Sequence, residues 1–166
     1  LPEKGGYGIG FLFLPRNPEK QQQAEKMVLS TVKRERGNVL GFREVPICPD
    51  CLGEIAYTSM PGMKQVFVEF PGTPELELER KLYIVRKRCE SEAVKLNLSI
   101  EEFYIPSFSS TTIVYKGMFV APQFESFYPD LKDKDFQSSF ALIHQRYSTN
   151  TFPSWPLAQP FRYIAH

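Results

Sequence analysis

The stretch that decides the fold is "FALIHQRYSTNTFPSWPLAQPFRYIAH", residues 140–166. Its apolar start, Phe140 to Ile143, predicts a last, buried strand over residues 141–147. Arg146 follows the apolar run almost directly, and an unpaired guanidinium is costly to bury. Hydroxyl and amide side chains then crowd residues 147–151. The end of this strand is therefore the candidate binding site.

Two interpretations of Arg146 follow from its chemistry. The planar guanidinium can donate two parallel hydrogen bonds to a carboxylate. With Tyr147, Thr149 and Asn150 beside it, that chemistry fits a pocket for a small zwitterion such as an amino acid. In the alternative, Arg146 pairs with an internal Asp or Glu and the hydroxyls form turns.

The composition is that of an ordinary globular chain. The 166 residues are 42% hydrophobic and 23% charged, with a net charge of +1, so no basic excess indicates nucleic acid. No apolar run approaches the ~20 residues that cross a bilayer. An aromatic share of 14% favours a sheet-rich core. One domain of mixed strands and helices is expected.

The periodicity of apolar residues predicts five further strands or strand-like runs and two long helices. Asn17 followed by Pro18, and Thr73 followed by Pro74, are typical helix starts. The expected strands are residues 7–14, 39–45, 64–70, 103–105 and 111–116, and the expected helices run from Asn17 to Arg36, with Gly37 as the stop, and from Thr73 to about Val94. Residues 119–127 are expected to be helical, and residues 129–135 to form a polar connection.

Other motifs point to no chemistry. "GGYGIG", residues 5–10, lies inside a strand pattern and not between a strand and a helix, so it is not a dinucleotide-binding loop. Cys48 and Cys51 form a CxxC pair in an expected loop or short turn, without the further ligands that zinc needs; incidental spacing is favoured over a zinc or redox site. Cys89 is expected in the core, and the basic residues at 80–88 are expected on a solvated face. No metal site is predicted.

The residues from His144 to His166 resemble the class II (N-terminal nucleophile) glutamine amidotransferase domain of glutamate synthase, large subunit. Further stretches agree in order along the chain: "LPEKGGYGIGFLFLPR", "REVP", "ERKLYIVRK", "FYIPSFSSTTIVYKGM" and "FYPDL". The resemblance implies an α+β fold, the four-layer α/β/β/α sandwich of N-terminal nucleophile hydrolases, in which residues 1–166 form the central part.

The resemblance assigns roles to five residues. Arg146 matches the arginine that binds the α-carboxylate of glutamine, and Tyr147, Thr149 and Asn150 match positions that line the same pocket. His166 matches the histidine directly before the Asn-Gly pair that forms the family's oxyanion hole. The nucleophilic N-terminal cysteine and the Asn-Gly pair are expected outside residues 1–166, so no catalytic residue is expected within them. The 166-residue chain is expected to be an internal fragment that is inactive alone.

The implied parent enzyme hydrolyses glutamine to glutamate and ammonia, and uses the ammonia for reductive amination of 2-oxoglutarate. It would carry FMN and an iron–sulfur cluster, neither of which is expected to bind this segment. Its electron donor, ferredoxin or a nicotinamide cofactor, is not encoded here. The expected location is the cytoplasm, or the plastid stroma in a plant or alga. Expected partners are glutamine and the other domains of the same polypeptide, without nucleic acid or membrane.

Two rival functions remain open: a non-catalytic amino-acid-binding module, and a scaffold derived from the same domain. Apolar side chains near the C-terminus, at Phe152, Trp155 and Phe161, have no obvious cover in the sequence pattern. Self-association through exposed edges, or disorder of this end, is therefore expected.

Overall fold

The computed structural model describes residues 2–3, 5–145 and 152–160. The chain divides into two compact units. The sheet unit comprises residues 1–44 and 61–114, and the cavity unit comprises residues 45–60 and 115–166. Within the described ranges, none of the helices has the length and apolar character required to cross a membrane.

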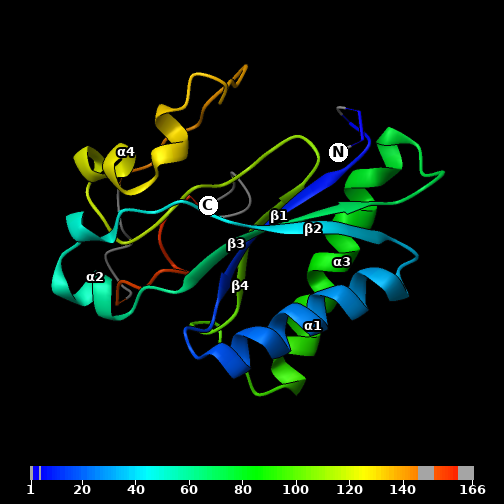
Figure 1. The fold of residues 1–166 in the computed structure, drawn as a ribbon, viewed down its shortest axis with the longest axis horizontal. Helices are drawn as coiled ribbons and strands as arrows, with labels where there is room; N and C mark the ends of the chain where they lie inside the picture. Colours follow the sequence, from blue (N-terminus) through cyan, green and yellow to red (C-terminus); the bar gives the residue numbers. More distant parts are fainter. Residues whose placement is uncertain (1, 4, 146–151, 161–166) are drawn as a thin grey trace. The chain divides into compact units, whose positions relative to one another are not determined.

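The sheet unit is built on four antiparallel strands in the order β2-β3-β1-β4. Strand β1 spans Gly8–Leu14, β2 Asn38–Glu44, β3 Gly62–Glu69 and β4 Tyr104–Ser109. The three strands expected from residues 7–14, 39–45 and 64–70 are confirmed, and the expected strand at 103–105 extends further than predicted. The first strand of the chain is thus central, paired with β3 on one side and β4 on the other (Figure 1).

The glycines of β1 serve close packing, which agrees with rejecting them as a phosphate-binding loop. A Cβ atom on Gly8 would lie 2.4 Å from Leu82 Cδ2, and one on Gly10 would lie 2.7 Å from Val66 Cγ1. Real Cβ atoms do not approach neighbours so closely. Glycine at these positions lets a helix side chain and a neighbouring strand side chain reach the backbone of β1.

Helices α1 (Pro18–Arg34) and α3 (Glu75–Lys95) cover one face of the sheet (Figure 1). Asn17 caps α1 as predicted, because its Oδ1 accepts a hydrogen bond of 3.0 Å from the amide of Lys20. The apolar stripes of both helices meet alternate residues of the strands in one core. Its members include Leu12, Leu14, Ala24, Val28, Val32, Val66, Val68, Leu82, Val85, Cys89 and Ile105.

Helix α1 ends where Gly37 predicted, but for a different reason. The left-handed residue is Arg36, with φ of 65°, and the amide of Gly37 donates to the Val32 carbonyl at 3.0 Å. A Cβ on Gly37 would lie 2.6 Å from the Phe70 ring. Gly37 is therefore required by the close approach of an aromatic ring rather than by its own backbone angle.

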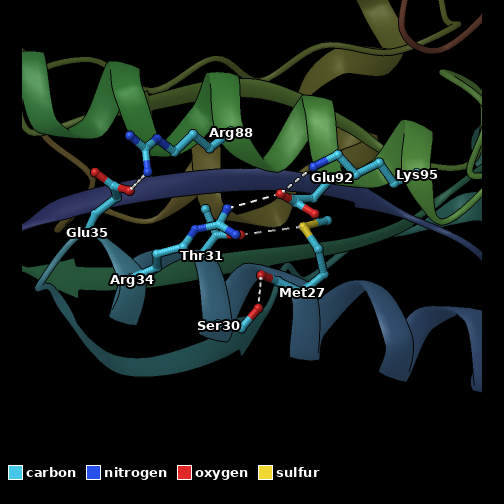
Figure 2. Close-up of polar contacts among 8 residues, drawn as sticks. All are labelled: Met27, Ser30, Thr31, Arg34, Glu35, Arg88, Glu92 and Lys95. Atoms are coloured by element: carbon cyan, nitrogen blue, oxygen red, sulfur yellow. Dashed lines mark hydrogen bonds and ion pairs between the residues drawn. The ribbon is translucent and has the colours of Figure 1, made fainter.

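Polar contacts link α1 to α3 along their solvent side (Figure 2). Arg34 donates to Glu92 Oε1 at 3.2 Å, Lys95 donates to the same oxygen at 3.1 Å, and Arg88 pairs with Glu35. Cys89 of α3 is fully buried as predicted, and burial raises the pKa of its thiol to about 12. One expectation for α3 is wrong, because Arg86 does not lie on a solvated face. Its exposed fraction is 6%, and its guanidinium carbon lies 5.2 Å from the centroid of the Tyr83 ring.

The cavity unit contains short helices and an aromatic cluster. Its elements are the 3-10 turn η1 (Pro49–Cys51), α2 (Glu54–Thr58), η2 (Ala121–Gln123), α4 (Phe124–Phe127) and η3 (Pro129–Lys132). Ring contacts join Tyr115, Phe119, Phe127, Tyr128 and Trp155, with Phe127 and Tyr128 centroids 4.7 Å apart. These rings provide the unit with its own apolar interior.

Two expected strands are wrong. Residues 111–116 form no strand, because Ser109 Oγ accepts hydrogen bonds from the amides of Thr111 and Thr112, both at 3.1 Å, and so turns the chain out of the sheet. Residues 141–145 form no strand either, and the side chains of Phe140 and Ile143 are 74% and 75% exposed rather than buried. A short apolar run becomes a strand only where a neighbouring strand pairs with it. Residues 146 and 147 of that expected strand lie outside the described residues.

Candidate functional site

The predicted site residues Arg146, Tyr147, Thr149, Asn150 and His166 all lie outside the described residues. The structure does describe both segments that lead into them. Residues 140–145 end directly before Arg146, and residues 152–160 stand between Asn150 and His166 in the chain. These two segments are the described neighbours of the predicted site residues in the sequence.

A cavity of about 460 Å³ lies in the cavity unit, and both segments line it. Leu142, Ile143, His144 and Gln145 contribute from the first segment, and Gln159 and Pro160 from the second. The size is within the range of small-molecule sites. Gln145, which directly precedes Arg146 in the sequence, and Pro160, which directly precedes residue 161, both line this cavity.

The remaining walls combine apolar and charged groups. Phe119 and Phe124 line the cavity from the aromatic cluster, and Glu125 and Lys116 bring opposite charges to its lining. Amide side chains at Gln145 and Gln159 add hydrogen-bonding capacity. Apolar walls with a few polar groups are typical of a pocket for a small polar ligand.

Lys116 is 2% exposed, although it carries a charge. Its ammonium donates to the main-chain carbonyls of Pro156 at 2.7 Å and of Ala158 at 2.9 Å. Its own carbonyl accepts a hydrogen bond of 2.8 Å from the hydroxyl of Tyr128. Burial raises the pKa of that hydroxyl well above its ordinary value, so Tyr128 stays protonated and remains a donor.

The turn that Lys116 contacts is well packed. Trp155 is 2% exposed, and its indole N–H donates to the Ala56 carbonyl at 3.0 Å. The prediction that Trp155 lacks cover is therefore wrong, whereas Phe152 is 94% exposed as expected; Phe161 lies outside the described residues. Gly117 allows this packing, since a Cβ there would lie 2.4 Å from both Phe119 and Trp155.

The CxxC loop supports another cavity wall. The amide of Cys48 donates to the Phe127 carbonyl at 2.9 Å, and the side chain of Gln123 donates to the Cys51 carbonyl. Residues 48–51 thus hold the η2–α4 segment that contributes Phe124 and Glu125 to the lining. The expected short turn at this motif is confirmed as η1.

The chemistry of the two CxxC thiols does not indicate a metal centre. Cys51 Sγ donates to the Cys48 carbonyl at 3.3 Å, and burial raises the pKa of the Cys51 thiol, which disfavours the thiolate that binds metals. Across residues 2–3, 5–145 and 152–160, no group of three or more His, Cys, Asp or Glu side chains is placed to hold a metal ion.

Sequence reasoning missed Lys116, Glu125 and the turn at Ser154–Ala158 as parts of this region. One signal was available for Lys116: it stands between aromatic residues in "VYKGMF", where a lysine bordered by apolar residues is unusual for a solvated loop. No comparable signal marks Glu125 or the turn, because their position depends on contacts with residues far away in the chain.

The comparison with known families completes this picture. The model of the class-II glutamine amidotransferases matches residues 1–166, the whole chain. The chain therefore belongs to the class-II glutamine amidotransferase family. This is a domain of the N-terminal nucleophile hydrolase type, and the resemblance found in the sequence is confirmed, as is a mixed α and β fold with an antiparallel sheet and helices.

Within that family the chain is similar to glutamate synthases. It is 42% identical to the glutamate synthase [NADPH] large chain of Bacillus subtilis, over 100% of this chain and 11% of the relative. It is 48% identical to the corresponding large chain of Azospirillum brasilense, over 95% of this chain and 10% of the relative. The chain is also 42% identical to the ferredoxin-dependent glutamate synthase 2 of Synechocystis, over 100% of this chain and 10% of the relative. The chain spans about a tenth of the length of these relatives.

Proposed function

We propose that this chain is part of the glutamine-hydrolysing domain of a glutamate synthase large chain. The observation that supports this most strongly is identity of 42–48% to three glutamate synthases over 95–100% of the chain. In the proposed reaction, glutamine is hydrolysed to glutamate and ammonia, and the ammonia serves the reductive amination of 2-oxoglutarate. The nucleophilic cysteine and the Asn-Gly oxyanion pair would be supplied by residues other than these 166, which alone should not turn over glutamine.

In this proposal the cavity region holds part of the glutamine site. Arg146 binds the α-carboxylate of glutamine through two parallel hydrogen bonds, and Tyr147, Thr149 and Asn150 line the pocket. His166 precedes the oxyanion pair. The support from the described residues is that Gln145, adjacent to Arg146, and Pro160 line one cavity of a size that suits a small molecule.

The further parts of the proposal concern the whole polypeptide. FMN and an iron–sulfur cluster would bind other domains, which would be the partners of this one. Relatives are named as NADPH-dependent or ferredoxin-dependent, so the electron donor is not assigned here. The proposed location is the cytoplasm, or the plastid stroma, since a relative from Arabidopsis thaliana is named as chloroplastic.

The test is a calorimetric titration of glutamine into the wild-type protein and into Arg146→Ala. Removing one partner of a carboxylate–guanidinium pair costs about 2–5 kcal/mol, so the Kd for glutamine should rise by a factor of about 30 or more. Arg80→Ala is the matched control, because Arg80 is 74% exposed in the sheet unit and pairs only loosely with Glu77 at 3.6 Å.

Each result has a clear meaning. Loss of binding in Arg146→Ala, with wild-type affinity in Arg80→Ala, would support the assignment of the α-carboxylate to Arg146. Equal affinities in the wild-type and Arg146→Ala proteins would contradict that role. No binding by the wild-type protein would show that residues other than these 166 are needed to complete the pocket.

A further inference from the structure

The turn at residues 48–51 carries a free thiol at each of its ends. Cys48 stands directly before the 3-10 turn η1, and Cys51 is the last residue of that turn. Side chains three residues apart in a 3-10 turn are eclipsed, and a rise of about 2 Å per residue places their Cα atoms about 6 Å apart. A disulfide bridges Cα atoms that are about 4.4–6.8 Å apart. The turn therefore holds the two cysteines at a separation that a disulfide can bridge.

The thiol of Cys51 lies close to Cys48. Its Sγ donates to the Cys48 carbonyl at 3.3 Å. Burial, and then the neighbouring Cys48 and Asp50, raise the pKa of the Cys51 thiol above its ordinary value. Repulsion between two thiolates that close together favours the forms in which they carry no charge, and a disulfide is one of them.

The two thiols differ in their access to solvent. Cys48 is exposed, whereas Cys51 is half-buried. Thiol–disulfide exchange begins at a thiol that an oxidant can reach, and a second thiol beside it completes the reaction. Cys48 has the position of the first thiol and Cys51 that of the second. Cys89 has neither, because it is fully buried and the pKa of its thiol is about 12.

Both ends of the turn are bonded to one wall of the cavity. The amide of Cys48 donates to the Phe127 carbonyl at 2.9 Å, at the end of α4. The side chain of Gln123, in η2, donates to the Cys51 carbonyl. The η2–α4 segment lines the cavity, so a bond that fixes the turn also fixes what this wall is attached to.

We propose that Cys48 and Cys51 form a reversible disulfide, and that this bond fastens the turn that supports the η2–α4 wall of the cavity. The oxidant is a thiol-derived disulfide of the oxidised glutathione class. The inference concerns a modification of this chain, and it does not rest on the proposed function.

The reaction balances in two exchange steps. The Cys48 thiolate, after losing its proton to water, attacks one sulfur of oxidised glutathione and releases the first glutathione thiolate, which takes up a proton. The Cys51 sulfur then attacks the Cys48 sulfur of this mixed disulfide and releases the second glutathione, which receives the Cys51 proton. Two protein thiols are oxidised to one disulfide, and one oxidised glutathione is reduced to two molecules of glutathione.

The test equilibrates the wild-type chain with mixtures of reduced and oxidised glutathione, once in buffer and once in concentrated urea. After an acid quench, free thiols are alkylated, and the cysteine peptides are identified by mass spectrometry. Cys89 is the internal control, and Cys48→Ser and Cys51→Ser are the matched variants. Hydrogen–deuterium exchange compares the reduced and oxidised wild type at the amide of Cys48 and at that of Leu52, which donates to the Pro49 carbonyl at 2.9 Å.

In buffer we expect the loss of two free thiols, at Cys48 and Cys51, without bound glutathione and without change at Cys89. Because the fold raises the effective concentration of the second thiol, the equilibrium constant should be about tenfold or more larger in buffer than in urea. Cys51→Ser should instead retain one glutathione on Cys48, and Cys48→Ser should remain largely unmodified. Oxidation should slow exchange at the Cys48 and Leu52 amides.

Three results would overturn the inference. Glutathione bound to both cysteines, or two thiols that stay free, would show that no disulfide joins them. Equal equilibrium constants in buffer and in urea would show that the fold does not bring the thiols together. A disulfide with unchanged amide exchange would show that it does not fasten the turn. All three are read on the wild-type chain, so they hold even where a variant is unstable.

Discussion

At the scale of single residues, Gly10 shows how a missing side chain can determine packing. It stands opposite Val66 in the β1–β3 register and opposite Phe108 in the β1–β4 register. A Cβ at Gly10 would lie 2.7 Å from Val66 Cγ1 and 3.3 Å from the Phe108 ring. The β-branched Val66 is stiff at its first side-chain torsion and cannot easily move away.

Gly10→Ala should therefore lower the free energy of unfolding by about 1–3 kcal/mol, the usual cost of overpacking a core. Gly62→Ala is the control in the same sheet, because the nearest atom to a Cβ at Gly62 is 3.6 Å away, an ordinary contact. Urea denaturation followed by circular dichroism measures both. Equal stabilities for the two variants would show that the β1 backbone shifts to make room.

Predictions for single residues were correct where the cause lies nearby in the sequence, and one was wrong where the cause is a contact with a distant residue. Asn17 caps its helix and Cys89 is buried because a short pattern around each residue determines its role. Trp155 was assigned to an uncovered surface, yet it is buried against Ala56, which is 99 positions away. No local pattern contains such a contact. The roles of Arg146, Tyr147, Thr149, Asn150 and His166 stay predictions.

At the scale of elements, the α1–α3 pair combines an apolar stripe with ion pairs at its edge. Glu92 receives hydrogen bonds from Lys95 on its own helix and from Arg34 on α1 (Figure 2). These hydrogen bonds, that of Lys95 first, lower the pKa of the Glu92 carboxyl below its ordinary value of 4.5. The folded state therefore favours the ionised carboxylate.

A lowered pKa in the folded state contributes stability above the unfolded pKa, and that contribution disappears as the pH falls through the folded pKa. Glu92→Gln should therefore reduce the melting temperature slightly at pH 7, by a few degrees at most, because exposed ion pairs contribute little. At pH 3 the difference from the wild type should shrink, and it should also shrink in high salt. Scanning calorimetry measures the melting temperatures, with the exposed Glu101→Gln as control. A difference independent of pH would rule out this electrostatic origin.

Elements with long, periodic patterns were predicted well from the sequence. The helices α1 and α3 and the strands β1, β2 and β3 each have a repeated apolar pattern and a recognisable start or stop. The short runs at 111–116 and 141–145 have no such repeated pattern. The first is turned by the hydroxyl of Ser109, and the second forms no strand. Helix α2 was missed because five residues are too few to show a period.

At the scale of the whole molecule, the two units differ in how their backbones are bonded. In the sheet unit, β1 and β3 form an antiparallel ladder without a register shift, with Leu12, Val66 and Val68 fully buried. Residues 136–145 of the cavity unit form no helix or strand, and Phe140 and Ile143 are largely exposed. Local stability should therefore differ strongly between these regions.

Hydrogen–deuterium exchange followed by mass spectrometry should show this contrast. Peptides covering residues 8–14 and 62–69 should exchange over hours, whereas a peptide covering 136–145 should exchange within seconds, because its amides lack a ladder. Added glutamine should not change the rates in β1 and β3. Slow exchange at 136–145 would contradict the prediction and would favour the strand that its apolar run first indicated.

The whole fold was accessible from the sequence mainly through resemblance. Composition and periodicity predicted a mixture of strands and helices, but the order β2-β3-β1-β4 depends on pairings between distant residues that no local pattern reveals. The family match supplies what those patterns do not. The pocket predicted at Arg146–Asn150 lies outside the described residues and stays a prediction, and the cavity walls at residues 119–125 were not anticipated.

The central place of β1 has a consequence for biosynthesis. Gly8 pairs with Val68 and Ile9 pairs with Ser109, so one partner strand follows 60 residues later and the other follows 100 residues later. At a translation rate of about 5–20 residues per second, β1 waits roughly 5–20 seconds for its second neighbour. During that time at least one edge of this apolar strand is open to other chains. Folding of this domain on the ribosome should therefore depend on chaperones that shield its first strand.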